Sequence, residues 1–171
     1  MDVNIVILYN KLKKYKLPNG KNLIVNVNVL NELFCFRQLK CLANESGGFL
    51  IGYEDLYSQS IIIEDITKPQ INDLRSNTSF LIRDRNHFER INKAATNDSF
   101  FIGTWHTHPQ EVVRPSGIDI IDWKKSLVEE IPGASYMIFI IVGRRNIKAW
   151  AGKKGQKIVG LREIRNSENT F

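Results

Sequence analysis

The stretch Gly103–Asp119 reads GTWHTHPQEVVRPSGID and joins an apolar run to the start of a helix. His106 and His108 stand one residue apart at the end of Phe100–Thr107, which has the composition of a buried strand. Alternate side chains of a strand point to the same face, so both imidazoles can aim at one point. Burying two imidazoles is costly unless something binds them, and this points to a metal site.

The residues after the strand lead the chain back toward the imidazoles. Pro109 ends the strand because it removes a hydrogen-bond donor. Asp119 falls in the first turn of a helix predicted over 116–131 and can face the histidines. Two histidines, one carboxylate and an open fourth position are the ligand set of a catalytic zinc site. Asp122, one turn later, is a rival ligand, but no comparable spacing supports it.

Metal-assisted hydrolysis also needs a group that removes a proton and returns it, and a carboxylate can do both. The candidate is Glu45 in the segment NESGGFLIG, directly before a Gly-Gly turn. Ser116-x-x-Asp119 has the pattern of a capping box, and the serine can cap the helix while its hydroxyl faces the metal. Each feature alone has a structural interpretation: packed histidines, a helix cap and a solvated loop acid.

Hydrophobic periodicity predicts the other elements, with Asp2–Tyr9 as a β-rich start and 166–171 as a frayed end. The order of elements predicts an α/β domain with a mixed, mostly antiparallel β-sheet and flanking helices. The whole chain, 1–171, is expected to be one domain with a core over about 22–151. Strands are predicted over 22–28, 48–53, 60–66, 78–82, 136–143, 147–151 and 157–164, and helices over 29–42 and 86–97.

Composition narrows the class of protein. The chain has 171 residues, of which 43% are hydrophobic and 25% charged, as in globular domains. The net charge is +6, and its densest basic stretch, 144–157, is either a solvated hairpin or a docking surface for an acidic partner or nucleic acid. The absence of an aromatic-interleaved basic groove argues against a nucleic-acid partner.

The cysteines and apolar runs indicate a cytoplasmic protein. Cys35 and Cys41 are predicted to lie on one helix, too far apart to be bridged, and therefore to be reduced thiols. The N-terminus lacks the features of a signal peptide, and no apolar run is long enough to span a bilayer, so no membrane partner is expected.

The remaining histidine and the tryptophans are predicted to be structural. His87, in the segment RNHFER, is predicted to be a surface residue of its helix. Trp105, Trp123 and Trp150 are predicted to pack in the core.

Together these motifs resemble the JAMM family of zinc peptidases, also called MPN+ or JAB. The family pattern is a glutamate before a Gly-Gly strand, then His-x-His-Pro, then Ser-x-x-Asp. The matching residues are Glu45-Ser46-Gly47-Gly48, His106-Thr107-His108-Pro109 and Ser116-Gly117-Ile118-Asp119. All five chemical positions are filled, unlike in the inactive MPN branch, and the implied fold is the JAB/MPN, cytidine-deaminase-like one.

The resemblance implies a role for each residue. His106, His108 and Asp119 would bind one Zn²⁺, Glu45 would act as general base and then general acid, and Ser116 would stabilise the oxyanion. The family cleaves peptide or isopeptide bonds after the C-terminal tail of ubiquitin or a ubiquitin-like protein. The resemblance does not indicate which residues bind the tail.

The chain is most similar to the small prokaryotic JAB peptidases of CBASS anti-phage operons. There a cGAS-like nucleotidyltransferase (CD-NTase) is conjugated to targets by an E1/E2-like enzyme encoded nearby, and the peptidase removes it. Two alternatives stay open: a JAB peptidase that trims the C-terminus of a ubiquitin-like or sulfur-carrier protein, and a non-catalytic metal-binding or DNA-associated JAB-like domain.

Overall fold

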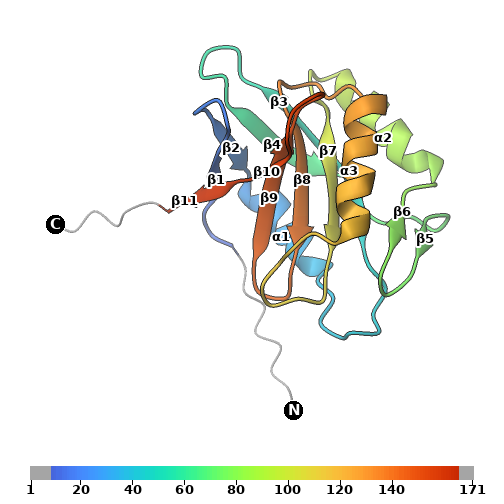
Figure 1. Cartoon of the computed structure of the whole chain (residues 1–171). Coiled ribbons are helices and arrows are strands. Elements are labelled where there is room, and N and C mark those ends of the chain that lie inside the picture. The colour runs from blue at the N-terminus through green and yellow to red at the C-terminus, as the bar shows by residue number, and fades with distance from the viewer. Residues whose placement is uncertain (1–8, 166–171) are drawn as a thin grey trace.

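The structure is a computed structural model that describes residues 9–165. Three helices accompany one large sheet and a small hairpin within this range (Figure 1). The helices are α1 (Val27–Cys35), α2 (Arg85–Ala95) and α3 (Gly117–Glu129). The strands are β1 (Lys13–Lys16), β2 (Asn22–Val25), β3 (Gly47–Glu54), β4 (Ile61–Ile66), β5 (Leu74–Arg75), β6 (Phe80–Leu81), β7 (Phe100–Thr107), β8 (Met137–Val142), β9 (Ile147–Gly152), β10 (Val159–Gly160) and β11 (Arg162–Ile164).

Nine strands form the large sheet in the order β10-β9-β8-β7-β3-β4-β2-β1-β11, and β5 pairs with β6 in a separate hairpin. The pairs β2–β4 and β7–β8 are parallel, and the other strand pairs are antiparallel. The expected α/β fold with a mixed, mostly antiparallel sheet is therefore confirmed. β7, which carries His106 and is followed directly by His108, lies in the interior of the sheet between β3 and β8.

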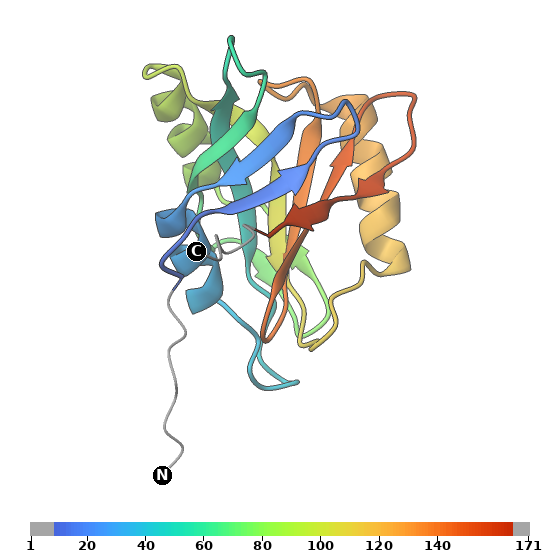
Figure 2. The same ribbon diagram turned by 90° about the vertical axis from the view of Figure 1, so that its left-hand side faces the viewer.

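Strand β8 shows how the sheet divides the core. Its residues alternate between two clusters, as the period of a strand requires. Ile138, Ile140 and Val142 join the cluster that contains the apolar face of α1. Met137, Phe139 and Ile141 join Trp123 and Leu127 of α3. Helices α1 and α3 thus cover opposite faces of the sheet (Figure 2).

Most predicted elements are confirmed, and β7 has the predicted bounds. The predicted helix over 29–42 is wrong at both ends, because α1 begins at Val27 and ends at Cys35. Beyond it the chain turns so that the amide of Gln38 donates to the carbonyls of Ala43 and Asn77. Two leucines that had suggested a longer helix are instead exposed: Leu39 by 50% and Leu42 by 86%.

Strand β1 was not predicted, since its sequence KKYK offers one apolar residue in four. Tyr15 is 2% exposed and its hydroxyl donates to the carbonyl of Ile147, so one side chain anchors the strand. The predicted strands over 2–9 and the frayed end over 166–171 fall outside the described residues, except for Tyr9, which lies in no strand.

Cys35 ends α1, whereas Cys41 lies in the loop after it, so the predicted placement of both on one helix is wrong. The two thiols are free and exposed. Within the described part of the chain, no helix has the length and apolar character needed to cross a membrane.

Candidate metal centre

Three of the predicted site residues meet at the end of β7. The Nε2 atoms of His106 and His108 lie 3.1 Å apart. The carboxylate of Asp119, in the first turn of α3, places one oxygen 3.1 Å from Nε2 of His106 and the other 3.4 Å from Nε2 of His108. His106, His108 and Asp119 are the only group of three or more potential metal ligands gathered in this way within residues 9–165.

The spacing of these donor atoms suits a tetrahedral zinc ion. Bonds of about 2.0–2.1 Å to such an ion place neighbouring ligand atoms about 3.3 Å apart. The three observed separations of 3.1, 3.1 and 3.4 Å bracket this value. Two imidazole nitrogens and one carboxylate oxygen are also ligand types that zinc accepts, so the residues present fit the ion.

Hydrogen bonding prepares His108 to act as a ligand. Its Nδ1 lies 3.1 Å from the backbone carbonyl of Arg114, which can only accept a hydrogen bond. Nδ1 therefore carries the proton, and Nε2 has its lone pair free to face His106 and Asp119. The side chain of Gln110 accepts from the backbone N–H of Arg114 and lies 3.4 Å from the same Nδ1, so it steadies the loop that orients the ring.

Aromatic packing supports the other imidazole. The ring of His106 lies edge-on to Trp123, with centroids 6.4 Å apart. Trp123 is itself stacked on Phe139 of β8 at 4.6 Å. Trp105 and Trp123 are buried, as predicted, and Trp150 is half-buried against the same cluster.

The start of α3 forms the predicted capping box. The hydroxyl oxygen of Ser116 accepts from the backbone N–H of Asp119, and the carboxylate of Asp119 accepts from the backbone N–H of Ser116. The cap fixes Asp119 in the orientation that faces the histidines. It uses the hydroxyl of Ser116 only as an acceptor, so the hydroxyl proton stays available for another group.

The electrostatics of the centre favour a positive charge. Burial raises the pKa of Asp119, but hydrogen bonds from His106 and His108 together hold it far below its usual range. Burial lowers the pKa of His108, but the hydrogen bond and charge of Asp119, with the charge of Glu45, raise it overall. A cation placed among these groups, whether proton or metal ion, is therefore stabilised.

Glu45 is buried, with 6% of its surface exposed, directly before β3. Its backbone is held by the β5–β6 hairpin: the N–H of Glu45 donates to the carbonyl of Ser76, and Nε of Arg75 donates to the carbonyl of Glu45. Arg75 also donates to the hydroxyl of Ser46 at 2.8 Å. The hairpin thus fixes the position of the predicted general base.

The environment of Glu45 suits proton transfer. Burial raises the pKa of its carboxyl, the nearby His106 and His108 lower it, and Asp119 raises it, with a net increase above the ordinary value. A carboxylate with a raised pKa is a better proton acceptor near neutral pH. Glu45 therefore has the burial and the neighbours that a general base requires.

A buried network that the sequence did not reveal joins Glu45 to the ligand strand. Thr107, between the two histidines, is fully buried and points to the opposite face of β7. Its hydroxyl accepts from the N–H of Ser46 and donates to Oε1 of Gln38, both at 3.0 Å. The sequence position of Thr107 could have indicated this network, because a polar residue between the two histidines must find hydrogen-bond partners on the buried face of the strand.

His87 is not the surface residue that was predicted, since it is fully buried in α2. Its Nε2 lies 2.8 Å from the carboxylate of Asp73 and its Nδ1 lies 2.6 Å from the hydroxyl of Thr67. The carboxylate of Asp73 can only accept, so Nε2 donates to it, which leaves Nδ1 to accept from the hydroxyl of Thr67; that hydroxyl also accepts from the N–H of Phe49. His87 was predicted to be exposed because its neighbours in sequence are mostly polar.

The metal centre opens into a cleft of about 350 Å³. Glu45, His106, Ser116 and Asp119 line the end of the cleft next to the candidate metal centre. One wall comes from β3, the segment around β6, and α2, and is mainly apolar; the other is α3, which contributes Ile118 and Trp123 together with polar side chains. The apolar wall includes Phe49, Phe80, Leu81, Ile82 and Phe88, and α3 contributes Asp122, Lys125, Ser126 and Glu129.

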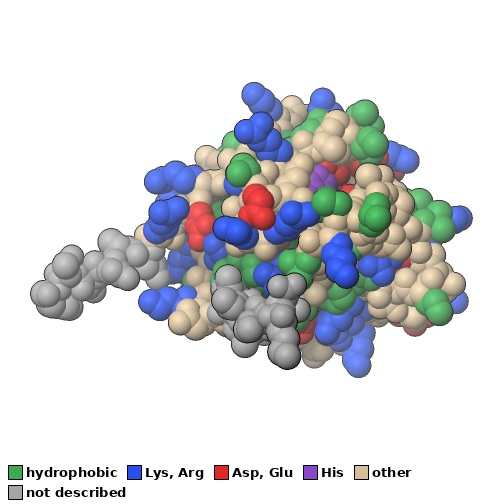
Figure 3. All heavy atoms as spheres, turned by 90° about the horizontal axis from the view of Figure 1, so that it is seen from below, with side chains coloured by type: hydrophobic (Ala, Val, Ile, Leu, Met, Phe, Trp, Pro, Cys, Tyr) green, Lys and Arg blue, Asp and Glu red, His purple; other side chains and the backbone are tan. Residues whose placement is uncertain are grey.

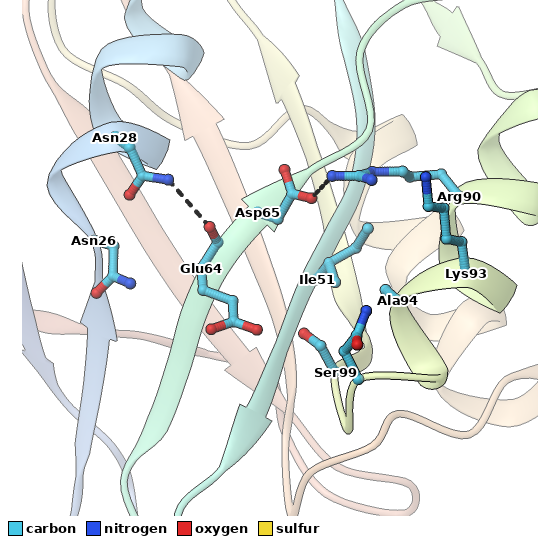
Figure 4. A pocket seen from close by; sticks show the side chains of 10 residues that line it. Asn26, Asn28, Ile51, Glu64, Asp65, Arg90, Lys93, Ala94 and Ser99 are labelled. Atoms are coloured by element: carbon cyan, nitrogen blue, oxygen red, sulfur yellow. Dashed lines mark hydrogen bonds and ion pairs between the residues drawn. The ribbon is translucent and has the colours of Figure 1, made fainter.

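A second, larger hollow of about 560 Å³ is separate from this centre (Figure 4). It lies between the start of α1, the strands β3 and β4, and α2. Arg90 pairs with Asp65 at its rim, and Glu64 and Lys93 bring the charge of its lining to zero. None of the predicted site residues lines it.

Comparison with known proteins agrees with this geometry. The family described as prokaryotic homologues of the JAB domain matches residues 30–153. A protein of Escherichia coli (strain TW11681) named CD-NTase/cGAS isopeptidase is 35% identical over 136 residues, which cover 78% of this chain and 82% of the relative. A protein of the same name from Vibrio cholerae serotype O1 is 31% identical over 139 residues, covering 80% and 84%.

A solved structure supports the fold. Protein DSY2949 from Desulfitobacterium hafniense, known from a solution structure, matches with a TM-score of 0.55 and 21% identity. The match covers 82% of this chain and 88% of that protein. The chain therefore belongs to the family of prokaryotic homologues of the JAB domain.

Proposed function

We propose that this protein is a zinc-dependent isopeptidase that cleaves after the C-terminal tail of a CD-NTase and releases it from the proteins to which it is conjugated. The observation that carries the proposal is the convergence of His106, His108 and Asp119 at zinc-ligand spacing beside a buried Glu45. The name shared by the Escherichia coli and Vibrio cholerae relatives supports the reaction and the substrate.

Each of the predicted site residues has a distinct role in hydrolysis. Zinc held by His106, His108 and Asp119 would lower the pKa of a bound water to about 7 and polarise the scissile carbonyl. Glu45 takes a proton from the attacking water and returns it to the leaving nitrogen. The hydroxyl of Ser116 donates a hydrogen bond to the oxyanion of the tetrahedral intermediate.

The cleft has a shape suited to an extended tail. Its polar and apolar walls face each other along α3, so a tail could alternate its side chains between them. We expect the tail to end at the catalytic residues, and we expect the protein to act in CBASS anti-phage defence in the cytoplasm. The enzyme that makes the conjugate would be an E1/E2-like enzyme encoded nearby.

The test offers the zinc-loaded protein two fusions, one joined through a CD-NTase C-terminal tail and one through ubiquitin. We expect cleavage at the CD-NTase junction, loss of cleavage with a chelator, and its return with zinc. Glu45→Gln should abolish cleavage while zinc stays bound, and Glu32→Gln, a partly exposed carboxylate on α1, should leave the rate unchanged. Undiminished cleavage by chelator-treated protein or by Glu45→Gln would refute the mechanism.

A further inference from the structure

A basic surface lies beside the metal centre and takes no part in the chemistry proposed above. Three loops form it: the loop after α1, the loop between β7 and α3, and the β8–β9 turn. Figure 3 looks onto this end of the molecule and shows many lysine and arginine side chains, with hydrophobic and a few acidic ones between them, near a histidine. We call it the arginine face and define it by Arg37, Leu39, Lys40, Leu42, Val112, Arg114 and Arg144.

We propose that the arginine face binds an acidic stretch of the conjugated target protein, beyond the scissile bond. This inference rests on the proposed function, because it assigns the second half of the same substrate. It also gives a role to the first part of the basic stretch 144–157.

The positive charges of the arginine face lack counter-ions. Arg37, Lys40, Arg114 and Arg144 form no ion pair with any carboxylate in residues 9–165. The neighbouring Arg145, by contrast, is paired with Glu111 at 2.8 Å. Four uncompensated cations on adjoining loops make a surface that attracts a segment of opposite charge.

Two of these guanidinium groups also have unused hydrogen-bond donors. Nη1 of Arg37 lies 3.4 Å from the carbonyl of Arg144, and Nη2 of Arg144 lies 3.1 Å from Sγ of Cys41. The Nε atoms of both arginines are buried, so an approaching carboxylate would reach the Nη groups that these two contacts leave free. A carboxylate is the acceptor that best matches a guanidinium, since it can receive two parallel hydrogen bonds.

The apolar members of the face favour a protein over a nucleic acid. Leu39 is 50% exposed, Leu42 86% and Val112 60%. Exposed aliphatic side chains among arginines are typical of protein–protein contacts. Surfaces that bind single-stranded nucleic acid instead stack bases on aromatic side chains, and the segments 37–43, 110–114 and 143–146 contain none.

The arginine face lies where the substrate would continue beyond the metal centre. The cleft for the tail lies between α3 and the β5–β6 hairpin, which holds Glu45 ahead of β3. The β8–β9 turn lies on the other side of β7 from β3. The N–H of Arg144 donates to the carbonyl of Gln110, whose side chain lies beside His108. A substrate whose tail fills the cleft therefore continues past the metal centre toward the arginine face.

The experiment uses three isopeptide-linked peptides with the same CD-NTase tail and different target sequences: rich in Asp and Glu, rich in Ser and Gly, or rich in Lys. Cleavage by zinc-loaded protein and binding to Glu45→Gln are measured on each, the latter by fluorescence anisotropy. We expect the acidic peptide to have a KM and a Kd about tenfold lower than the neutral one, at similar kcat. Lys40→Glu should remove this preference, and Lys154→Glu, in the turn after β9, should not.

Each outcome decides the proposal. Equal affinity for the three peptides, or equal effects of Lys40→Glu and Lys154→Glu, would overturn it. Binding of duplex DNA at physiological salt that is lost in Lys40→Glu and outcompetes the acidic peptide would overturn it in favour of a nucleic acid. If no peptide is cut but the acidic one still binds Glu45→Gln through Lys40, the proposed function fails and the arginine face stands.

Discussion

Replacing Thr107 with valine tests whether the buried network behind the ligand strand holds the site together. Valine keeps the shape of threonine but removes the hydroxyl. The N–H of Ser46 and the Oε1 of Gln38 would each lose a partner, and both residues are buried, at 4% and 1% exposure. An unpaired buried group costs about 1–3 kcal/mol, so the loss of partners for two groups should lower the free energy of unfolding by roughly 2–6 kcal/mol. For a domain of this size the melting temperature should fall by roughly 4–24 °C.

The assay is urea unfolding of protein kept in a chelator, so that metal binding does not contribute to stability. Thr107→Ser is the matched control, because it keeps the hydroxyl and loses one methyl group, at a cost of about 1 kcal/mol. Both variants should keep the m-value of the unchanged protein. A loss below about 0.5 kcal/mol in Thr107→Val, or equal losses in the two variants, would refute the role given to this network.

Three further predictions concern acid stability, packing and metal binding. Burial raises the pKa of Asp73, but hydrogen bonds from the N–H groups of Arg83, Gln70 and Asp84 and from His87 lower it overall. The ionised carboxylate therefore stabilises the fold fully above about pH 4, and this stabilisation is lost as the pH falls through the lower pKa of the folded state. Free energies of unfolding measured from about pH 6 to 2 should fall less steeply in Asp73→Asn than in the unchanged protein. Gly48→Ala would place Cβ 2.2 Å from the carbonyl oxygen of Thr67 and should cost several kcal/mol, whereas Gly117→Ala, with nothing within 4 Å, should be neutral or stabilising in the same denaturation assay. Zinc at about a hundred times its Kd should add about 2.7 kcal/mol to the free energy of unfolding. A similar gain in Asp119→Asn would contradict the assignment of Asp119 as a zinc ligand.

The sequence predicted the parts of the fold that depend on strong periodicity. β7, α2, α3 and the β8–β9 hairpin follow from apolar spacing and from the cap at Ser116. Strand β1 was missed because Tyr15 alone carries its burial, and α1 was extended too far because Leu39 and Leu42 continued a helical pattern that the chain does not follow. In both cases contacts distant in sequence overrode the local pattern.

The candidate site was predictable where the chemistry needs particular residue types at fixed spacing. His106, His108 and Asp119 converge as the strand and helix geometry indicated, and Glu45 lies beside them. The groups that position them were not predicted: Gln38 and Arg75 are distant in sequence from the residues they contact, and Gln110, two residues after His108, belongs to a loop with no recognisable pattern. His87 was misassigned for the same reason, since its partner Asp73 comes from a loop 14 residues away.

The central claim is that two imidazoles and one carboxylate hold a single zinc ion at the end of β7. Zinc K-edge X-ray absorption of the protein loaded with one equivalent of zinc tests it most directly. The account predicts four light-atom neighbours at about 2.0–2.1 Å, two of them with the multiple-scattering pattern of imidazole, and loss of one imidazole in His108→Ala. A sulfur neighbour at about 2.3 Å, or a spectrum that His108→Ala leaves unchanged, would contradict it.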